Sequence, residues 1–280
     1  MSELIGTGLI LLAASFAAFQ RLFVKTSNDR VAFLVGVNLV SLIVAAIAMP
    51  LVPALPLSLW PYLLLSSLFY SLAMYFLARA YRTGDFGIIT PAQGAFKATL
   101  IAVLAILILG ETANPYHFVA ILLLAVGFLI QVPWTRTVKD DHFRSLGFSL
   151  LIAGASAAQY TVDIFAVRAT DFPLSYIVWN LLIGSPIVLV GFWLRGRRLW
   201  SQLAENGKDI AWGSGLDIIG YGIVLFVAKY LSLLSLIPLL NLDIVIAVLI
   251  GIFVLREPFP RQRLIASFFL AMAAITVTLY

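Results

Sequence analysis

Residues 86–110, FGIITPAQGAFKATLIAVLAILILG, form an apolar stretch with a single cation, Lys97, near its middle. A bilayer core about 30 Å thick requires roughly 20 helical residues, so this stretch is long enough to span a membrane. A charge at that depth is costly unless it faces a partner or a water-filled cavity. We therefore expect Lys97 to point into the interior of a helix bundle.

The whole chain has the composition of a polytopic membrane protein. Of its 280 residues, 62% are hydrophobic and 11% are charged, whereas charged residues make up about 25% of a typical soluble domain. Continuous Leu, Ile, Val and Ala runs without alternation predict helices, because lipid offers the backbone no hydrogen-bond partner. The expected fold class is all-α, with ten transmembrane helices at residues 4–24, 31–52, 57–81, 86–109, 114–133, 145–167, 173–194, 209–231, 234–255 and 262–280.

The basic residues predict the orientation of the chain. Of 18 Lys and Arg residues, 15 fall in the loops after odd-numbered spans, two (Arg168 and Lys229) fall on the opposite side, and Lys97 lies within a span. Because positive loops stay in the cytoplasm, we expect a multi-pass protein of the cytoplasmic (inner) membrane with both termini extracytoplasmic.

The residue types present exclude several classes of chemistry. The chain has no cysteine and two histidines, His117 and His142, both at loop edges, so we expect no metal site. No phosphate-binding glycine motif is present, and the loops leave no room for a catalytic domain. We expect a protein that is not an enzyme, that needs no cofactor and that binds no nucleic acid, because its basic charge reflects topology.

Two halves of the chain resemble each other. Pro91, an apolar helix and Leu109-Gly110-Glu111 recur as Pro238, an apolar helix and Leu255-Arg256-Glu257. Upstream, Phe16-Ala17-Ala18-Phe19-Gln20 is loosely similar to Ser156-Ala157-Ala158-Gln159, and Asn38-Leu39-Val40 to Asn180-Leu181-Leu182. Five spans per repeat is an odd number, so residues 1–135 and 145–280 are predicted to be inverted repeats, an arrangement common in secondary transporters.

This pattern resembles a known family. The stretch Ala78-Arg79-Ala80-Tyr81-Arg82-Thr83-Gly84-Asp85, followed by Pro91 and by Leu107 to Glu111, is similar to the end of one EamA-type repeat of the drug/metabolite transporter superfamily. The resemblance covers both halves of the chain. It implies export or exchange of small metabolites through a central cavity lined by both halves, and amino acid exporters are among the possible relatives. Many members keep their termini in the cytoplasm, contrary to the charge pattern here.

Few ionisable residues fall within the predicted spans, and each marks a candidate functional site. They include Lys97, Asp163, Asp217 and Asp243, and three polar pairs are four residues apart and so share a helix face: Gln93 with Lys97, Gln159 with Asp163, and Asp217 with Tyr221. Lys97 and Asp243 fall near the middle of their spans and match each other in the repeat within one position. They are expected either to bind the carboxylate and ammonium of a substrate or to form a permanent ion pair between the halves.

Further candidates are aromatic residues, prolines and glutamates. Tyr70, Tyr75, Tyr160, Trp179 and Tyr221, with Asn180, are expected to line an amphipathic substrate site. Asp163, Asp217, Pro91 and Pro238 are assigned to coupling or gating, since burial favours protonation of a carboxylate and proline bends a helix. Glu111 and Glu257 are expected to pair with basic neighbours or to cap the next helix.

The sequence favours a secondary transporter that exports or exchanges amino acids or related zwitterionic or amphipathic metabolites by alternating access. The chain is expected to act in the lipid bilayer as a monomer or weak homo-oligomer. Export of organic cations or drugs and exchange of nucleotide sugars are the alternatives within this class. An intramembrane enzyme and a structural subunit are the alternatives outside it.

Overall fold

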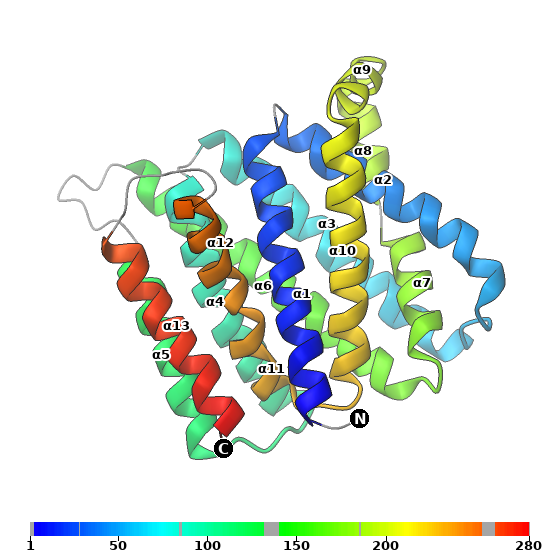
Figure 1. Ribbon diagram of the computed structural model, residues 1–280. Helices are drawn as coiled ribbons and strands as arrows, with labels where there is room; N and C mark the ends of the chain where they lie inside the picture. The colour runs from blue at the N-terminus through cyan, green and yellow to red at the C-terminus, as the bar shows by residue number, and fades with distance from the viewer. Residues whose placement is uncertain are drawn as a thin grey trace.

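The computed structural model is a bundle of helices (Figure 1), and it describes residues 3–27, 29–83, 86–131, 140–184, 186–253 and 261–279. Every regular element in these ranges is helical, so the expected all-α class is confirmed. Five helical segments are long and apolar enough to cross a membrane. They are Leu4–Val24, Arg30–Leu51, Leu57–Leu77, Gly147–Ala169 and Gly207–Ala228.

The helices follow one another along the chain with short connections. Their bounds are α1 Glu3–Thr26, α2 Arg30–Ala48, η1 Met49–Leu51, η2 Leu57–Leu59, α3 Trp60–Thr83, α4 Phe86–Leu107, α5 Pro115–Gln131, α6 Asp140–Ala169, α7 Pro173–Ile183, α8 Pro186–Arg195, α9 Arg198–Glu205, α10 Gly207–Ala228, α11 Leu233–Leu240, α12 Leu242–Phe253 and α13 Arg261–Leu279.

Two of the expected spans are not continuous helices, which corrects the sequence prediction. The span expected at 173–194 is divided into α7 and α8 at Gly184, whose N–H donates to Asn180 O at 2.6 Å. A Cβ on Gly184 would lie 2.5 Å from that same oxygen. The following helix begins at Pro186, which has no N–H to extend a helical ladder. This glycine and proline together account for the break.

The span expected at 234–255 is also interrupted. It is divided into α11 and α12 at Asn241, three residues after the buried Pro238. Pro238 cannot donate to the preceding turn, which weakens the helix at this point. The Asn241 side chain then donates to Ile237 O at 2.8 Å, and Ile244 N donates to Asn241 O at 3.2 Å. The sequence prediction did not recognise that this proline lies deep enough to divide the span.

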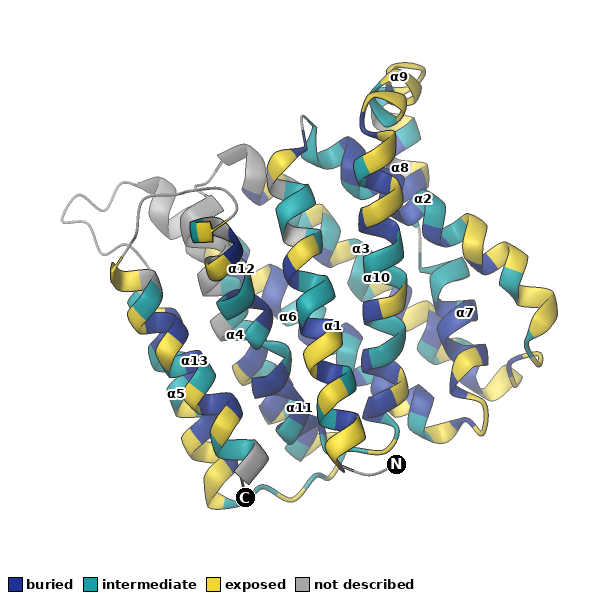
Figure 2. Ribbon diagram, in the orientation of Figure 1, coloured by how far each residue is buried: buried dark blue, intermediate teal, exposed yellow. Residues whose placement is uncertain are grey.

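The long polar connection after residue 195 contains a short helix, α9, at the tip of the bundle (Figure 1). Its Leu199 is fully buried against Ala32 and Val35 of α2, while Trp200 is exposed. Figure 2 shows that exposed residues lie along the outward faces of the helices, and many of these are large and apolar. Such a surface suits lipid rather than water.

Two helices from different parts of the chain occupy central positions. α1 packs against α10, α11 and α12, and α6 packs against α3, α4 and α10. Buried alanines such as Ala13, Ala14 and Ala18 on α1 and Ala153 and Ala157 on α6 allow this close approach. At the edges, α5 packs against α13 and α2 packs against α7. The centre of the bundle therefore combines segments that are distant in sequence.

The two ends of the bundle carry different ionic contacts. Both chain termini lie at one end (Figure 1). At the other end, Asp29 caps α2 by accepting from Val31 N and Ala32 N at 3.0 Å each, and it pairs with Arg195 of α8. Although burial alone raises the pKa of Asp29, the Arg195 guanidinium and the two backbone N–H groups lower it below its ordinary value.

Candidate functional site

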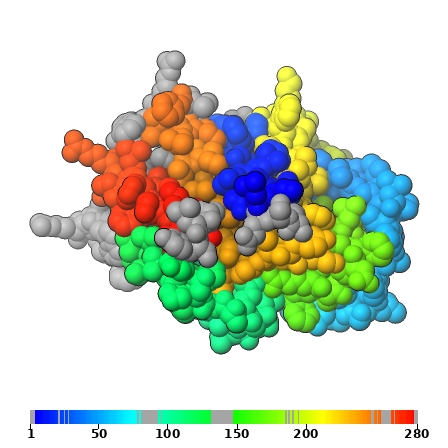
Figure 3. All heavy atoms as spheres, turned by 60° about the horizontal axis from the view of Figure 1, so that its bottom comes forward, coloured from blue at the N-terminus to red at the C-terminus, as the bar shows by residue number. Residues whose placement is uncertain are grey.

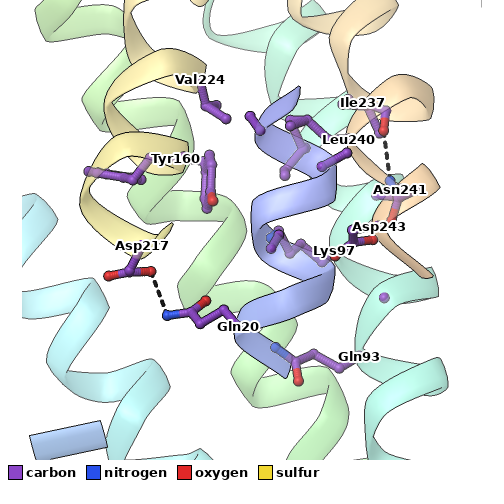
Figure 4. A pocket seen from close by; sticks show the side chains of 18 of the residues that line it. Gln20, Gln93, Lys97, Tyr160, Asp217, Val224, Ile237, Leu240, Asn241 and Asp243 are labelled. Atoms are coloured by element: carbon purple, nitrogen blue, oxygen red, sulfur yellow. Dashed lines mark hydrogen bonds between the residues drawn. The ribbon is translucent and has the colours of Figure 1, made fainter. Parts of the chain in front are cut away.

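A central cavity of about 330 Å³ lies between α1, α4, α6, α10 and the α11–α12 break. Its polar lining consists of Gln20, Gln93, Lys97, Tyr160, Asp217, Tyr221, Asn241 and Asp243. Figure 4 shows that these side chains come from helices far apart in sequence and converge on one space. Volumes of this order are typical of small-molecule sites.

Lys97 lies inside this cavity, as the sequence analysis expected for a midspan cation. Its Nζ lies 4.5 Å from the centroid of the Tyr160 ring, which is a favourable cation–π distance. Figure 4 shows Lys97 and Asp243 in the same part of the cavity. Asp243 is 6% exposed and lies in the first turn of α12, where the helix dipole favours a carboxylate. The break after Asn241 thus places an anion near the midspan cation.

Asp217 also lines the cavity, and its partner is a residue that the sequence analysis did not select. Gln20 Nε2 of α1 donates to Asp217 Oδ1 at 2.8 Å, as the dashed line in Figure 4 shows. The sequence did contain a signal for Gln20, because the segment that ends in Gln20 is similar to the segment that ends in the candidate residue Gln159. Asn241 was also missed, and it enters the cavity because it occupies the helix break that follows Pro238.

Asp163 lies beside the cavity rather than in its lining and is fully buried. Tyr176 OH and Asn180 Nδ2 of α7 donate to its Oδ1 at 2.7 and 2.9 Å. Tyr221 OH of α10 and Gln159 Nε2 donate to its Oδ2 at 2.5 and 3.4 Å. We call these five residues the Asp163 cluster. It brings together Gln159, Asp163, Asn180 and Tyr221, which the sequence selected separately, and adds Tyr176, which it missed.

Three of the aromatic candidates lie outside the cavity lining. Tyr70 OH donates to Asn38 Oδ1 of α2 at 2.9 Å. Tyr75 is 52% exposed and packs against Phe76 and Arg79. Trp179 packs against Trp60 with ring centroids 5.4 Å apart, and its Nε1 has no hydrogen-bond partner among the described residues. Only Tyr160 and Tyr221 of the aromatic candidates border the cavity.

Glu111 joins three segments at the end of the bundle that holds the termini. Gly110 has a φ of +67°, a conformation that glycine adopts readily, and it turns the chain out of α4 toward Glu111. The Glu111 carboxylate accepts from Arg168 Nη2 at 2.7 Å and from the backbone N–H groups of Leu233 and Leu234 at 2.9 and 3.0 Å. Ser232 Oγ donates to it at 2.8 Å. We call this group the Glu111 latch.

The latch caps α11 from outside that helix. The N-cap Ser232 makes no side-chain capping bond of its own, so the Glu111 carboxylate supplies the acceptor for the first N–H groups. Burial alone raises the pKa of Glu111, but the hydrogen bonds from Leu233, Arg168, Leu234 and Ser232 outweigh it and hold the pKa below its ordinary value. Figure 3 shows the gold α10–α11 connection packed against the green α4–α5 connection at this end.

Glu111 therefore does pair with a basic neighbour, but it caps a helix of the other half rather than the next helix along the chain. Glu257 and the side chain of Pro91 lie outside the described residues. Pro238 is buried inside α11. Among the described residues, no group of three His, Asp or Glu side chains is placed to hold a metal ion.

Comparisons with known proteins bear on the fold alone. No protein-family model matches this sequence, and no curated protein matches it either. A solved structure described as "Crystal structure of protein" superposes with a TM-score of 0.75 at 13% sequence identity, over 98% of this chain and 98% of that one. The helical architecture is therefore similar to one seen in an experimental structure over nearly the full length of both chains.

Proposed function

We propose that this protein is a secondary transporter that moves small zwitterionic or amphipathic metabolites out of the cytoplasm by alternating access. The central cavity carries the proposal, because it presents a cation, Lys97, and an anion, Asp243, at membrane depth beside the Tyr160 ring. A substrate carboxylate would bind Lys97, its ammonium would bind Asp243, and its apolar part would pack on the aromatic ring.

We also propose that the chain crosses the membrane ten times as two inverted repeats, as in the drug/metabolite transporter superfamily. The helix packing supports this. In two such repeats α1 corresponds to α6, α3 to α10, and α4 to α11–α12, and the most extensive contacts between helices have counterparts between the corresponding helices. The α3–α6 contact becomes α10–α1, and the α4–α6 contact becomes α11–α12 with α1. Tyr70 bonded to Asn38 and Tyr221 bonded to Asn180 at 3.5 Å are matching pairs in the two halves.

The cavity lining suggests which side is open. Its residues on the first three helices include Val24 near the end of α1, Leu34 near the start of α2 and Leu77 in the second half of α3. Toward the other end the lining reaches Leu233, where the Glu111 latch joins the connections. With the orientation expected from the basic residues, this is a cytoplasm-facing state whose outer end is closed by the latch.

Export of organic cations is a second candidate that one observation favours. Two carboxylates, Asp217 and Asp243, line the cavity, and Lys97 is the one cation among the described lining residues. Asp217 is bonded to the neutral Gln20 side chain, so its charge is available to a cationic substrate. Nucleotide-sugar exchange fits less well, because a diphosphate usually requires several basic groups.

Counterflow in proteoliposomes separates these substrates. Leucine, phenylalanine, choline and a nucleotide sugar are tested side by side with wild type, Lys97→Met and the exposed control Lys208→Met. If Lys97 binds a carboxylate, Lys97→Met weakens amino acid binding by roughly 1.5 to 3 kcal/mol, spares analogues that lack the carboxylate, and Lys208→Met changes neither.

A purely structural role for Lys97 gives a different result. Lys97→Met would then lower thermal stability by leaving Asp243 without its countercharge, and the double variant with Asp243→Asn would recover both stability and transport. Full amino acid transport by that double variant would contradict the proposed binding site, and the absence of counterflow for every compound would contradict the transporter assignment.

A further inference from the structure

Asp163, like Asp217, has neutral hydrogen-bond partners at its described contacts, but it makes more of them. The carboxylate is fully buried, and its hydrogen-bond partners come from four helices: Ser66 of α3, Gln159 of α6, Tyr176 and Asn180 of α7, and Tyr221 of α10. Within the described part of the chain, no Lys or Arg forms an ion pair with it. By contrast, Glu111 and Asp29 each pair with an arginine.

Neutral partners make Asp163 suited to bind a proton. An ion pair would lose its Coulombic attraction when its carboxylate became protonated, whereas here protonation removes an unmatched charge from a low-dielectric interior. The surrounding groups also argue against a metal cation. N–H and O–H groups point at both carboxylate oxygens, so both oxygens already accept hydrogen bonds and face donors rather than further ligand oxygens.

Tyr221 connects this buried carboxylate to the central cavity. It is the member of the Asp163 cluster that lines the cavity, while its OH lies 2.5 Å from Asp163 Oδ2. Its ring packs edge-on against Tyr160, 6.1 Å between centroids, and Tyr160 contacts Lys97. Tyr176 donates to the other carboxylate oxygen but does not line the cavity. The two tyrosines thus make similar bonds to Asp163 and differ in their contact with the cavity.

The Tyr221 hydroxyl also has an alternative acceptor. Asn180 Oδ1 lies 3.5 Å from it, so the hydroxyl can rotate away from the carboxylate without losing every partner. This alternative is required of a proton relay, because a hydroxyl that passes on its hydrogen must be able to donate the replacement hydrogen elsewhere.

We propose that Asp163 is the proton-binding site of the transporter and that the Tyr221 hydroxyl is its relay to the cavity; this rests on the proposed transport function. A hydronium ion in the cavity gives a proton to the Tyr221 oxygen as the Tyr221 hydroxyl hydrogen passes to Asp163 Oδ2. Water remains in the cavity, Tyr221 stays neutral, and Asp163 becomes a neutral acid. The new Asp163 O–H donates to Tyr221, whose hydroxyl then donates to Asn180 Oδ1.

Proton binding at this position acts on the contacts between helices. The charged carboxylate holds α7 through Tyr176 and Asn180 and holds α10 through Tyr221, and hydrogen bonds to a charged group are about twice as strong as those to a neutral one. Protonation therefore loosens α6 from α7 and α10. Since α10 also carries Asp217 of the cavity wall, the proton changes the helix that contacts the substrate.

Titratable groups on the neighbouring helices also face this region, and within the described part of the chain none of them forms an ion pair with Asp163. They are Tyr160 on α6, Tyr176 on α7, Tyr221 and Asp217 on α10, Tyr70 on α3 and Lys97 on α4. Tyr70 is bonded to Asn38, Asp217 to Gln20, and Lys97 lies over the Tyr160 ring.

Two measurements on the whole protein test the proposal. Infrared difference spectra are recorded between about pH 8 and about pH 5, a range in which a buried carboxylate can titrate. They detect the carbonyl stretch of a newly protonated carboxylic acid without any substrate. We expect Asp163→Asn to lose a component of this band that Asp217→Asn retains. After a rapid pH jump, its appearance in Tyr221→Phe should be slower by roughly a hundredfold, the low end of the effect of a positioned proton-transfer group. Tyr176→Phe should retain the wild-type rate.

The second measurement is the pH-gradient dependence of leucine and choline counterflow. Asp163→Asn and Tyr221→Phe should lose this dependence, whereas Tyr176→Phe should keep it. A band that is unchanged in Asp163→Asn, or equal rates in the two tyrosine variants, would overturn the proposal. If wild type shows the band and the Tyr221 effect but no counterflow of either compound, the proton site stands and the proposed transport function fails.

Discussion

The Glu111 carboxylate, which follows α4, lies 2.7 Å from the Arg168 guanidinium at the end of α6 and accepts a hydrogen bond from it. Arg168 in turn donates to Ala228 O at 2.9 Å and to Leu231 O at 3.0 Å, so its guanidinium also holds the end of α10. The Glu111 latch therefore ties α4, α6, α10 and α11 together at one end of the bundle. Its removal should affect both stability and access to the cavity.

The first prediction concerns the latch as a closure. Glu111→Gln leaves several donors with a weaker acceptor, which should lower the free energy of unfolding by about 1 to 3 kcal/mol. The natural chain has no cysteine, so a single Ile237→Cys in the cavity wall provides one labelling site. In vesicles, a membrane-impermeant maleimide added outside should label this cysteine faster in the Glu111→Gln background. Glu205→Gln, an exposed glutamate on α9, is the matched control, and equal labelling in both backgrounds would show that the latch does not close the cavity.

The second prediction concerns acid stability. The folded-state pKa of Glu111 lies below its ordinary value, so its contribution to stability is complete above the unfolded-state pKa of about 4.3. That contribution is lost as the pH falls through the lower folded-state pKa. Thermal unfolding in detergent should therefore show a steeper loss of wild-type stability below about pH 4.3 than Glu111→Gln shows. Parallel pH profiles for the two proteins would contradict the assigned role of the carboxylate.

The third prediction concerns the helix break beside Asp243. Pro238→Ala restores a backbone N–H inside α11 and should favour a continuous helix through Asn241. We expect thermal stability to stay equal or rise, while counterflow falls because Asn241 and Asp243 turn away from the cavity. Pro173→Ala is the control, since Pro173 begins α7, where the missing N–H costs no helical bond. Normal counterflow by Pro238→Ala would show that the break is not required.

The fourth prediction concerns orientation. Both termini lie at the end of the bundle that holds the Glu111 latch (Figure 1), and the charge pattern of the sequence predicts that this end is extracytoplasmic. A reporter that is active only in the cytoplasm should be silent when fused after Tyr280, and active when inserted after Asn206 beside α9. The reverse pattern would place the cavity opening on the outside and change the proposed state to outward-facing.

The sequence by itself determined the all-α class, the approximate bounds of most helices and the inward placement of Lys97. These follow from local physics: long apolar runs form helices in lipid, and a midspan charge is stable only inside the bundle. It also selected Asp217, Asp243, Tyr160 and Tyr221, which the structure places around one cavity, because polar residues are rare in such spans. The transport function remains a proposal from that arrangement.

Only the tertiary structure determined which side chains contact one another. Gln20 reaches Asp217 from a helix nearly 200 positions away in the sequence, Glu111 caps a helix of the other half, and Tyr70 and Tyr75 are not part of the lining of the cavity that contains Tyr160. Helix periodicity specifies which residues share a face, but not which neighbouring helix that face meets. The break at Asn241 likewise depends on how deeply Pro238 lies in its span, which packing fixes and local sequence does not.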